Sequence, residues 1–330
     1  MTNALILGIN GQDGSFLAEI LLEKGYKVHG LVRRTAKDNL QNINHIINDI
    51  DLHYGDLNDP VSIQKAINLS KPKEIYNEAD QDHAGISFDI PSYNFDVTGS
   101  AVGRILEIIK NTNVNIKFFQ PVTSNMFGSV KICPQNEETP FYPLNPYACA
   151  KVFAYHVCRM YRKNYSMFIS TATFYNHESE RRTENYVTRK ITKAAARISL
   201  GLQNELVLGD ITAKIDWGYA KEYMQAAWQI MQLSKPSDYI IGTGVETSVK
   251  EFVIKTFKYL NLDYKKYLTT SKKFIRPARN LSLIADISKA KKEFGFEPKT
   301  NVDDLIKIMV DHDIQREKNF ANYIYTSNDK

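Results

Sequence analysis

The sequence is poor in cysteine, since its 330 residues include only Cys133, Cys149 and Cys158. Their number is odd and their spacing does not match a metal site, so a reducing cytoplasmic compartment is the default and no metal is expected. No apolar run reaches the roughly 18 to 20 residues that a membrane-spanning helix needs. A strand pattern follows Met1 directly, which predicts no signal peptide. We therefore expect a cytoplasmic protein without a membrane segment.

A strong charge bias is also missing. The chain has 42 basic and 37 acidic residues, for a formal net charge of +5. No stripe of Lys and Arg with interleaved aromatic residues occurs, so we expect no nucleic-acid partner. An anionic small ligand such as a nucleotide fits this charge. With 43% hydrophobic and 24% charged residues, the chain is globular and long enough for one large domain or two modest ones.

Strand and helix patterns alternate through the first half of the chain. An apolar strand at 4–7, a helix pattern at 15–24 and a strand at 27–32 form a βαβ unit, which is parallel. Further strands are expected at 51–54, 74–77, 117–122 and 167–174, and helices from residue 60, at 94–110 and at 146–162. This alternation predicts an α/β fold with a doubly wound parallel (Rossmann) sheet in residues 1–175.

The alternation becomes irregular after Tyr175. We expect a loop over 176–188, followed by helices and short strands. The predicted helices cover 187–200, 221–233, 288–294 and 302–320, and the predicted strands cover 206–208 and 239–241. We interpret residues 176–330 as a smaller mixed α/β lobe that covers the carboxyl ends of the strands and binds substrate. Some of its segments return to the first domain.

A glycine-rich turn follows the first strand and opens the first helix. Gly8, Gly11 and Gly14 would permit a tight turn, close approach to a pyrophosphate and close helix–strand packing, which predicts a dinucleotide site. The acidic residue that usually ends the second strand is lacking, and Arg33 and Arg34 stand there instead. Two arginines suit a 2′-phosphate, so we favour NADP over NAD, although both could simply be solvated.

Asp56 and Leu57 end the third strand and are placed to hold an adenine.

A tyrosine and a lysine four residues apart point to redox catalysis. Tyr147 and Lys151 lie one helical turn apart, and Thr123 and Ser124 end a strand at the edge where open sheets bind ligands. We expect the ammonium to lower the pKa of the phenol, which then acts as acid and base in hydride transfer at a sugar or alcohol carbon. Lys151 would also hold a ribose hydroxyl. An ordinary surface pair is the alternative reading.

These motifs resemble those of the extended short-chain dehydrogenases/reductases and, more narrowly, of the GDP-mannose 4,6-dehydratase family. The resemblance covers almost the whole chain. It is carried by segments 8–19 (GINGQDGSFLAE), 53–57 (HYGDL), 139–143 (TPFYP), 175–179 (YNHES), 187–191 (VTRKI) and 216–218 (DWG).

The resemblance implies an NADP-dependent lyase acting on a GDP-sugar for deoxysugar biosynthesis. In such enzymes C4 of the hexose is oxidised, a base removes the C5 proton, water leaves C6, and the hydride returns to C6. The family also implies a homodimer or homotetramer, paired through the helices at 94–110 and 146–162.

The resemblance further assigns residues to two ligands. Besides the residues above, it places at the cofactor Asn10, Gln12, Asp13, Gln81, His177 and Arg182. It places at the substrate Asn176, Glu178, Thr188, Arg189, Lys190, Lys193, Gly209, Lys214 and Arg276.

The chain departs from the family inside the site. Asn125 stands where the family has the Glu that removes the C5 proton, and loss of a general base usually costs about 10²- to 10⁴-fold in rate. The family's Asn-Leu-Ala-Ala-Gln-Ser stretch is Asn-Glu-Ala-Asp-Gln-Asp here (77–82), which adds three carboxylates near the expected pyrophosphate and nicotinamide. Ile215 replaces an Arg of the family, and Arg279 lies near where a Glu is expected.

Three hypotheses remain open at this point. The protein is a GDP-sugar 4,6-dehydratase in which another carboxylate, Asp82 or Glu178, serves as the base. Alternatively, it is a C4 oxidoreductase or epimerase of nucleotide sugars, because Tyr147 and Lys151 can oxidise C4 without that base. Third, it is a non-catalytic nucleotide-sugar-binding relative of an active enzyme.

Overall fold

The structure of the chain is a computed structural model that describes residues 1–36, 39–271 and 282–328. A seven-stranded parallel sheet has the strand order β10-β6-β5-β4-β1-β2-β3. Its strands are β1 (Asn3–Leu7), β2 (Lys27–Val32), β3 (Ile50–Tyr54), β4 (Glu74–Asn77), β5 (Lys117–Thr123), β6 (Ile169–Phe174) and β10 (Asp238–Ile241). The order reverses between β1 and β4, which confirms the predicted doubly wound sheet.

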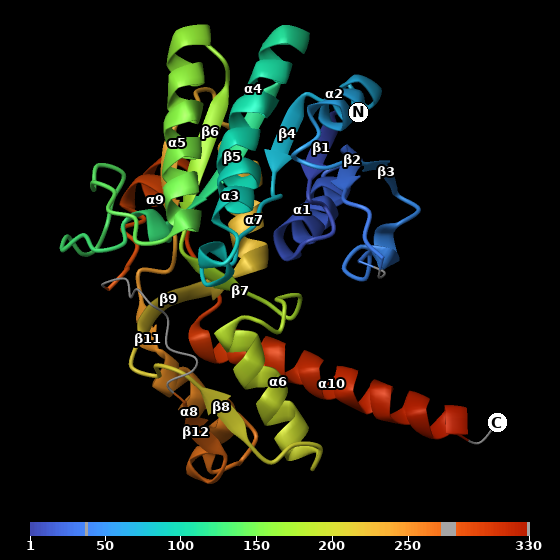
Figure 1. Cartoon of the computed structure of the whole chain (residues 1–330), viewed down its shortest axis with the longest axis vertical. Coiled ribbons are helices and arrows are strands. Elements are labelled where there is room, and N and C mark those ends of the chain that lie inside the picture. The colour runs from blue at the N-terminus through green and yellow to red at the C-terminus, as the bar shows by residue number, and fades with distance from the viewer. Residues whose placement is uncertain (37–38, 272–281, 329–330) are drawn as a thin grey trace.

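Helices cover both faces of this sheet (Figure 1). Side chains of β1 alternate between the faces: Ala4 and Ile6 join one apolar core, and Leu5 and Leu7 join the other. The first core includes α1 (Gln12–Glu23) and α7 (Ala220–Gln232). The second includes α2 (Pro60–Ser70), α4 (Ala101–Thr112) and α5 (Pro146–Tyr165). A short helix, α9 (Ser288–Phe294), contacts β10.

The helix predicted at 94–110 is interrupted in the structure. A short α3 (Pro91–Asn94) leads into a π-helical segment, Phe95–Ser100, and α4 follows. The hydroxyl of Thr98, inside the wide π turn, accepts a hydrogen bond from the Gln81 backbone N–H over 3.2 Å. The long helix predicted at 94–110 is therefore present, but its first part is π-helical rather than α-helical. The irregular turn packs against the loop after β4, and such π segments often occur at functional sites.

The remaining elements form a second lobe with its own core around Trp217, Phe252 and Phe257. A three-stranded sheet contains β7 (Asn176–Glu178), β9 (Lys214–Tyr219) and β11 (Glu246–Ser248), and a two-stranded sheet contains β8 (Leu206–Leu208) and β12 (Leu268–Thr270). The helices are α6 (Val187–Ser199), α8 (Val249–Tyr259) and α10 (Val302–Asn328). The loop predicted over 176–188 was wrong in part, since β7 pairs with β9 there.

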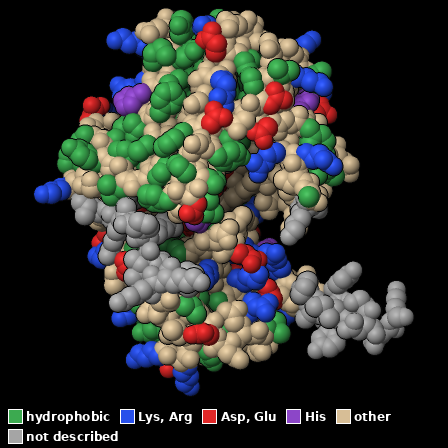
Figure 2. Space-filling model, in the orientation of Figure 1, with side chains coloured by type: hydrophobic (Ala, Val, Ile, Leu, Met, Phe, Trp, Pro, Cys, Tyr) green, Lys and Arg blue, Asp and Glu red, His purple; other side chains and the backbone are tan. Residues whose placement is uncertain are grey.

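The carboxyl ends of the large sheet's strands face the second lobe (Figure 1). Although α7 and β10 follow residue 175, α7 packs in the first apolar core and β10 is a strand of the large sheet. The boundary proposed after Tyr175 therefore stays a prediction. In the space-filling view, the surface is hollowed where the two lobes meet (Figure 2). Within the described ranges, no helix is both long and apolar enough to cross a membrane.

Candidate active site

The turn between β1 and α1 requires glycine at two positions. Gly8 has a φ of +80°, and a Cβ atom there would lie 2.9 Å from Cα of Ala79. A Cβ atom on Gly14 would lie 2.3 Å from the carbonyl oxygen of Gly8. Gly11, the N-cap of α1, places no side chain in front of the helix. The first N–H groups of α1 and its dipole therefore fit the pyrophosphate of a dinucleotide, as the sequence predicted.

The end of β2 presents two cations to solvent, since Arg33 and Arg34 are both exposed. Nη1 of Arg33 donates to the Tyr93 hydroxyl over 2.7 Å. Asn10 joins the glycine turn to the segment after β2, because its Nδ2 donates to the Asn39 carbonyl over 2.9 Å. Both arginines thus lie at the carboxyl edge of the sheet, where open α/β sheets bind ligands, and the exposed side chain of either can turn toward a phosphate.

Thr123, Tyr147 and Lys151 meet at the carboxyl end of β5, as predicted. α5 begins here because Oδ1 of Asn145 accepts a hydrogen bond from the Ala148 backbone N–H over 2.8 Å. The Tyr147 phenol interacts with the Thr123 hydroxyl. Nζ of Lys151 lies 5.7 Å from the centre of the Tyr147 ring. The three side chains are almost entirely buried, so a substrate would meet them in a dry environment.

Asn125 lies beside this group but offers it no base. Its Nδ2 donates to Oγ1 of Thr123 over 3.1 Å, and its backbone N–H donates to the same oxygen over 3.3 Å. The neighbouring Ser124 is buried. An amide does not take up a proton near neutral pH, so Asn125 positions the Thr123 hydroxyl and cannot remove a proton from a sugar.

The loop after β4 brings a carboxylate to Lys151. Oδ2 of Asp80 lies 2.6 Å from Nζ of Lys151, and the same ammonium donates to the Pro121 carbonyl over 2.9 Å. The sequence showed Asp80 as an added carboxylate, but it did not reveal this pair. The signal was the strand order: β4 lies between β1 and β5, so its loop reaches both the glycine turn and the catalytic helix.

The expected lowering of the Tyr147 pKa was wrong for this structure. Burial, followed by the charges of Asp80 and Asp82, raises the pKa of the Tyr147 phenol well above its ordinary value. The Lys151 ammonium, which was expected to lower this pKa, is paired with Asp80. The phenol is therefore protonated here and is set to donate rather than accept a proton.

The two candidate replacement bases lie in different surroundings. Glu178 is buried, with Oε2 accepting from the Thr188 hydroxyl over 2.5 Å and lying 3.3 Å from Nε of Arg182. The side chain of Asp82 is 50% exposed and its Oδ2 lies 3.5 Å from Nη1 of Arg182. Burial and then the charge of Asp82 raise the pKa of Tyr186, which the sequence analysis did not single out. Asp82 thus faces the same space as the phenols, whereas Glu178 does not reach solvent.

A half-buried ion pair links the glycine turn to the second lobe. Nε2 of His177 lies 2.8 Å from Oδ2 of Asp13, and Gln12 accepts from the Ser179 hydroxyl over 2.8 Å. Although burial opposes charge on both partners, their mutual attraction raises the pKa of His177 and lowers the pKa of Asp13. Both side chains therefore hold the lobes together beside the expected pyrophosphate.

The other predicted residues are spread over both lobes. Gln81 accepts at Oε1 from Nδ2 of Asn94 over 3.0 Å, and Asp56 accepts from the Asn58 backbone N–H over 2.9 Å, next to the buried Leu57. Asn176, Lys190 and Gly209 are half-buried in the second lobe.

Three predicted substrate cations already have partners, and one cannot be placed. Lys193 pairs with Glu184 at 2.5 Å, and Lys214 pairs with Glu246 at 2.6 Å. Arg189 is buried against Asp313 of α10, so a nucleotide does not reach it in this arrangement. Arg276, with Arg279, lies outside the described residues.

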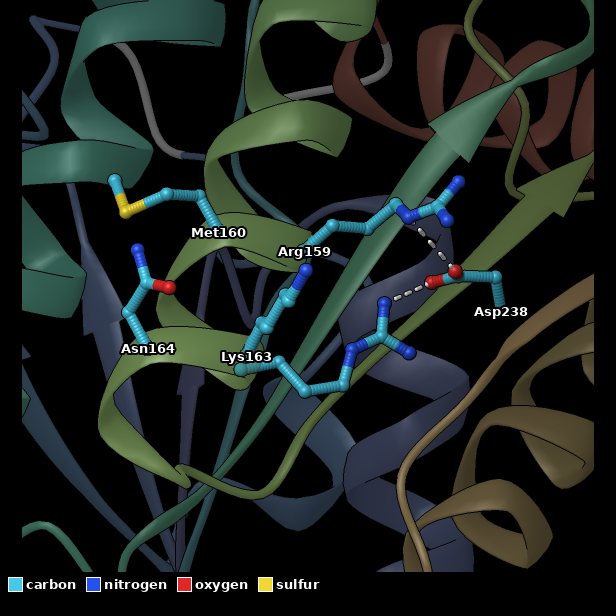
Figure 3. A pocket seen from close by; sticks show the side chains of 6 residues that line it. Arg159, Met160, Lys163, Asn164 and Asp238 are labelled. Atoms are coloured by element: carbon cyan, nitrogen blue, oxygen red, sulfur yellow. Dashed lines mark hydrogen bonds and ion pairs between the residues drawn. The ribbon is translucent and has the colours of Figure 1, made fainter.

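A separate hollow of about 470 Å³ lies at the far end of α5 (Figure 3). Asp238 is drawn there between two guanidinium groups, and Arg159 Nε lies 3.7 Å from its Oδ2. Asp238 begins β10, so the hollow lies at the amino edge of the sheet. Between Tyr147 and Arg159 the helix rises about 18 Å, which separates this hollow from the catalytic group.

Comparison with known proteins shows which family has a sequence similar to that of this chain. A family model described as GDP-mannose 4,6 dehydratase matches residues 5–309. GDP-mannose 4,6 dehydratase 1 of Arabidopsis thaliana is 44% identical over 337 residues, which cover 98% of this chain and 93% of the relative. These matches span both lobes, including the glycine turn and the tyrosine–lysine pair.

Two solved structures share the fold at low sequence identity. The dTDP-glucose 4,6-dehydratase of Bacillus anthracis in complex with NAD has a TM-score of 0.84 at 22% identity, covering 96% of this chain and 98% of its own. The Pseudomonas aeruginosa protein named RMD, complexed with NADPH, has a TM-score of 0.80 at 17% identity, covering 96% and 100%. Both likenesses support the two-lobed arrangement and say nothing further about chemistry.

Proposed function

The chain belongs to the GDP-mannose 4,6-dehydratase family, and from that premise we propose that it removes water from a GDP-hexose, with GDP-mannose as the first candidate. The observation that carries the proposal is the meeting of Thr123, Tyr147 and Lys151 at the carboxyl end of β5, across from the glycine turn. This arrangement suits oxidation of a sugar hydroxyl next to a dinucleotide.

The chain's residues divide the proton transfers between them. A bound nicotinamide would supply the hydride acceptor and donor, so that no net oxidation remains. Tyr147 takes the proton of the C4 hydroxyl once its phenol is ionised, and Thr123 holds the same sugar oxygen. Lys151 favours the phenolate only when its ammonium is not neutralised, so its pairing with Asp80 has a direct effect on this step.

Asp82 is the carboxylate best placed to replace the missing Glu. It is half exposed at the mouth of the site, and its charge reaches both Tyr147 and Tyr186. Glu178 is buried and engaged with Thr188 and Arg182, so it would have to leave two partners before it reached a sugar. We infer that Asp82 removes the C5 proton and assists departure of the C6 hydroxyl.

The proposal is tested by incubating the protein with NADP and GDP-mannose in deuterated water, followed by mass spectrometry. Loss of one water with gain of one deuterium would show C5 deprotonation and dehydration. Loss of two hydrogens, or an unchanged mass with reduced cofactor accumulating, would instead support a C4 oxidoreductase. An unchanged sugar and an unchanged cofactor would contradict both activities for GDP-mannose.

The role of Asp82 predicts a specific defect in Asp82→Asn. Dehydration should slow by about 10²-fold or more, because a general base is lost, while oxidation at C4 continues. Absorbance at 340 nm should then show reduced cofactor building up in the variant. The control is Asp89→Asn, which alters an exposed aspartate seven residues further along, at the end of the neighbouring 3-10 turn. Equal rates in both variants would remove Asp82 from the mechanism.

A second candidate function is supported by Asn125. Because its amide donates to Thr123 and cannot act as a base, the chain could stop at oxidation of C4 or return hydride to the other face. A non-catalytic role is supported by the raised pKa of Tyr147 and by the pairing of Lys151 with Asp80, because both disfavour the phenolate. The deuterium experiment separates these readings from dehydration.

The choice of NADP is part of the proposal. Two exposed arginines and no carboxylate stand at the end of β2, so a 2′-phosphate would meet positive charge. Calorimetric titration should give a lower Kd for NADP than for NAD. Arg33→Ala combined with Arg34→Ala should remove that preference.

We also propose that two copies pair through α4 and α5. Hydrophobic side chains gather over these helices in the space-filling view (Figure 2), and exposed apolar residues of this face include Phe88, Ile90, Phe95, Phe153 and Met160. A patch of this kind on a monomer commonly marks an interface. The pairing would give a homodimer or a homotetramer built from it. A cytoplasmic location is a separate part of the proposed function.

A further inference from the structure

The wall of the dinucleotide crevice is unusually rich in carboxyl groups. The loop formed by residues 77–82 follows β4, and Ala79 in it touches the glycine turn. Glu78 and Asp80 lie on this loop, and Asp13 faces them from the start of α1. A pyrophosphate that enters between the two loops therefore meets fixed negative charge as well as the helix dipole.

Within this group, only Asp80 is bonded to the catalytic lysine. The pair is 2.6 Å long, and its side chains are only 5% (Lys151) and 14% (Asp80) exposed. Solvent screens such a pair weakly, and a charge-assisted hydrogen bond of this length is among the stronger ones. Asp82 is turned toward Arg182 instead, at 3.5 Å.

Glu78, the other carboxyl group of this loop, does not compete for Lys151. Burial, followed by the charge of Asp13, raises the pKa of Glu78 well above its ordinary value, which favours its neutral form. Its Oε1 is buried without a hydrogen-bond partner among the described residues. Burial, opposed by the charge of Lys151, also raises the pKa of Asp80, but the 2.6 Å contact makes Asp80 the carboxyl group that pairs with the ammonium.

The geometry leaves Lys151 little freedom to hold anything else. An ammonium has three N–H groups, and Asp80 and the Pro121 carbonyl take two of them. A ribose hydroxyl at Lys151 would have to share the ammonium with a carboxylate or displace it.

We propose that Asp80 is a positioning residue that holds Lys151 in a closed ion pair and thereby weakens binding of the nicotinamide dinucleotide. This inference rests on the proposed function, in that it takes such a dinucleotide as the ligand of the crevice. Bound dinucleotide would either share the ammonium with Asp80 through its third N–H group or have Asp80 swing away from Lys151 or become neutral. The closed pair would also keep the Tyr147 phenol protonated while the crevice is empty.

The proposal is tested by titrating NADP into the purified full chain and into Asp80→Asn, with Kd measured by calorimetry and no sugar present. The substitution keeps the shape of the side chain and removes its charge. NADP should bind Asp80→Asn about 10- to 100-fold more tightly, the range that one charge-assisted hydrogen bond contributes. Asp80→Glu, which restores a carboxylate, should return the Kd toward that of the parent chain.

Two controls isolate the ion pair from the general effect of charge. Asp82→Asn removes a carboxylate from the same loop without touching Lys151. Because it also breaks the contact with Arg182, it reports the loss of this charge and of that contact together. Asp51→Asn breaks another aspartate–lysine pair, with Lys27 at 3.0 Å, on the edge strand β3. Thermal melting checks that each variant is folded, and Asp80→Ala serves as a second variant if Asp80→Asn is unstable.

The inference is overturned if folded Asp80→Asn and Asp80→Ala bind NADP no more tightly than the parent chain, or if Asp82→Asn gains as much. Its outcome is separate from that of the proposed function. A gain in NADP affinity together with unchanged GDP-mannose would support the ion-pair role and contradict dehydration. Dehydration by the parent chain without any gain in NADP affinity in Asp80→Asn would support the proposed function and contradict the ion-pair role.

Discussion

At the scale of the single residue, the chain's chemistry depends on which group can take a proton. Asn125 donates to the Thr123 hydroxyl and accepts no proton, at the position where the family resemblance leads us to expect Glu. The same site contains Asp82, which is half exposed, lies beside Arg182 and raises the pKa of Tyr147 by its charge. In the proposed mechanism, an acid/base pair for oxidation is therefore retained, and the dehydration step depends on a carboxylate from a different loop.

This division predicts a gain in Asn125→Glu. A carboxylate at the end of β5 would stand next to Thr123 and Tyr147, so dehydration should accelerate by about 10- to 100-fold, part of the range for a general base. The rate is measured as release of the 4-keto-6-deoxy product from GDP-mannose. Asn125→Gln, which has the same length and no charge, is the matched control. If the two variants are equally fast, Asp82 or another group already supplies a full base.

Residue types alone predicted the tyrosine, the lysine, the threonine and the glycines, because their spacing has a direct geometric meaning. The state of Tyr147 could not be predicted in the same way. Its pKa depends on burial and on Asp80 and Asp82, which lie more than sixty positions earlier in the chain. Charges brought together by strand order are invisible to local spacing.

At the scale of the element, long periodic segments were predictable and short ones were not. The strands and helices of the large sheet follow the alternation seen in the sequence, whereas β7, β9 and β11 are three to six residues long and their pairing is not local. The helix α8 and the π-helical turn at Phe95–Ser100 were also missed. A π turn needs only one extra residue, so it changes the spacing of apolar residues along the helix very little.

The contact between α6 and α10 depends on a buried charge pair. Nη2 of Arg189 lies 2.7 Å from Oδ1 of Asp313, and both side chains are 1% exposed. Arg189→Met should lower the free energy of unfolding at pH 7 by roughly 3–5 kcal/mol, because the carboxylate would be left buried without a partner. Urea unfolding measures the loss. The double variant Arg189→Met with Asp313→Leu should recover most of it, and failure to do so would mean that the helix contact needs the ions themselves.

The pH dependence of stability follows from the same carboxyl group. Burial, opposed by Arg189, raises the pKa of Asp313 from its ordinary value of 3.8 to about 6. The folded chain therefore binds more protons than the unfolded chain between these values, and this contribution to stability is lost as pH rises through about 6. In Asp313→Asn that part of the slope should vanish.

At the scale of the whole molecule, the two lobes are joined at the edge where ligands bind. The Asp13–His177 pair and the Gln12–Ser179 hydrogen bond both cross this junction. The substrate residues predicted on α6 and β7 thus belong to a lobe that the glycine turn itself helps to hold against the large sheet. The paired Asp80 and Lys151 lie at the carboxyl edge of the same sheet.

The opposite surface, over α4 and α5, carries the last prediction. Phe153 is 51% exposed in the middle of α5, and Phe95 and Met160 lie exposed on the same face. A charge at Phe153 would have to be desolvated between two copies, so Phe153→Asp should convert a dimer to a monomer at micromolar concentration. Light scattering coupled to size-exclusion chromatography measures the mass. Tyr54→Asp, at an aromatic residue that is 69% exposed on the edge strand β3, should leave it unchanged. A monomeric parent chain, or a dimer that survives Phe153→Asp, would show that this face does not join two copies, and the exposed phenylalanines would then need another partner.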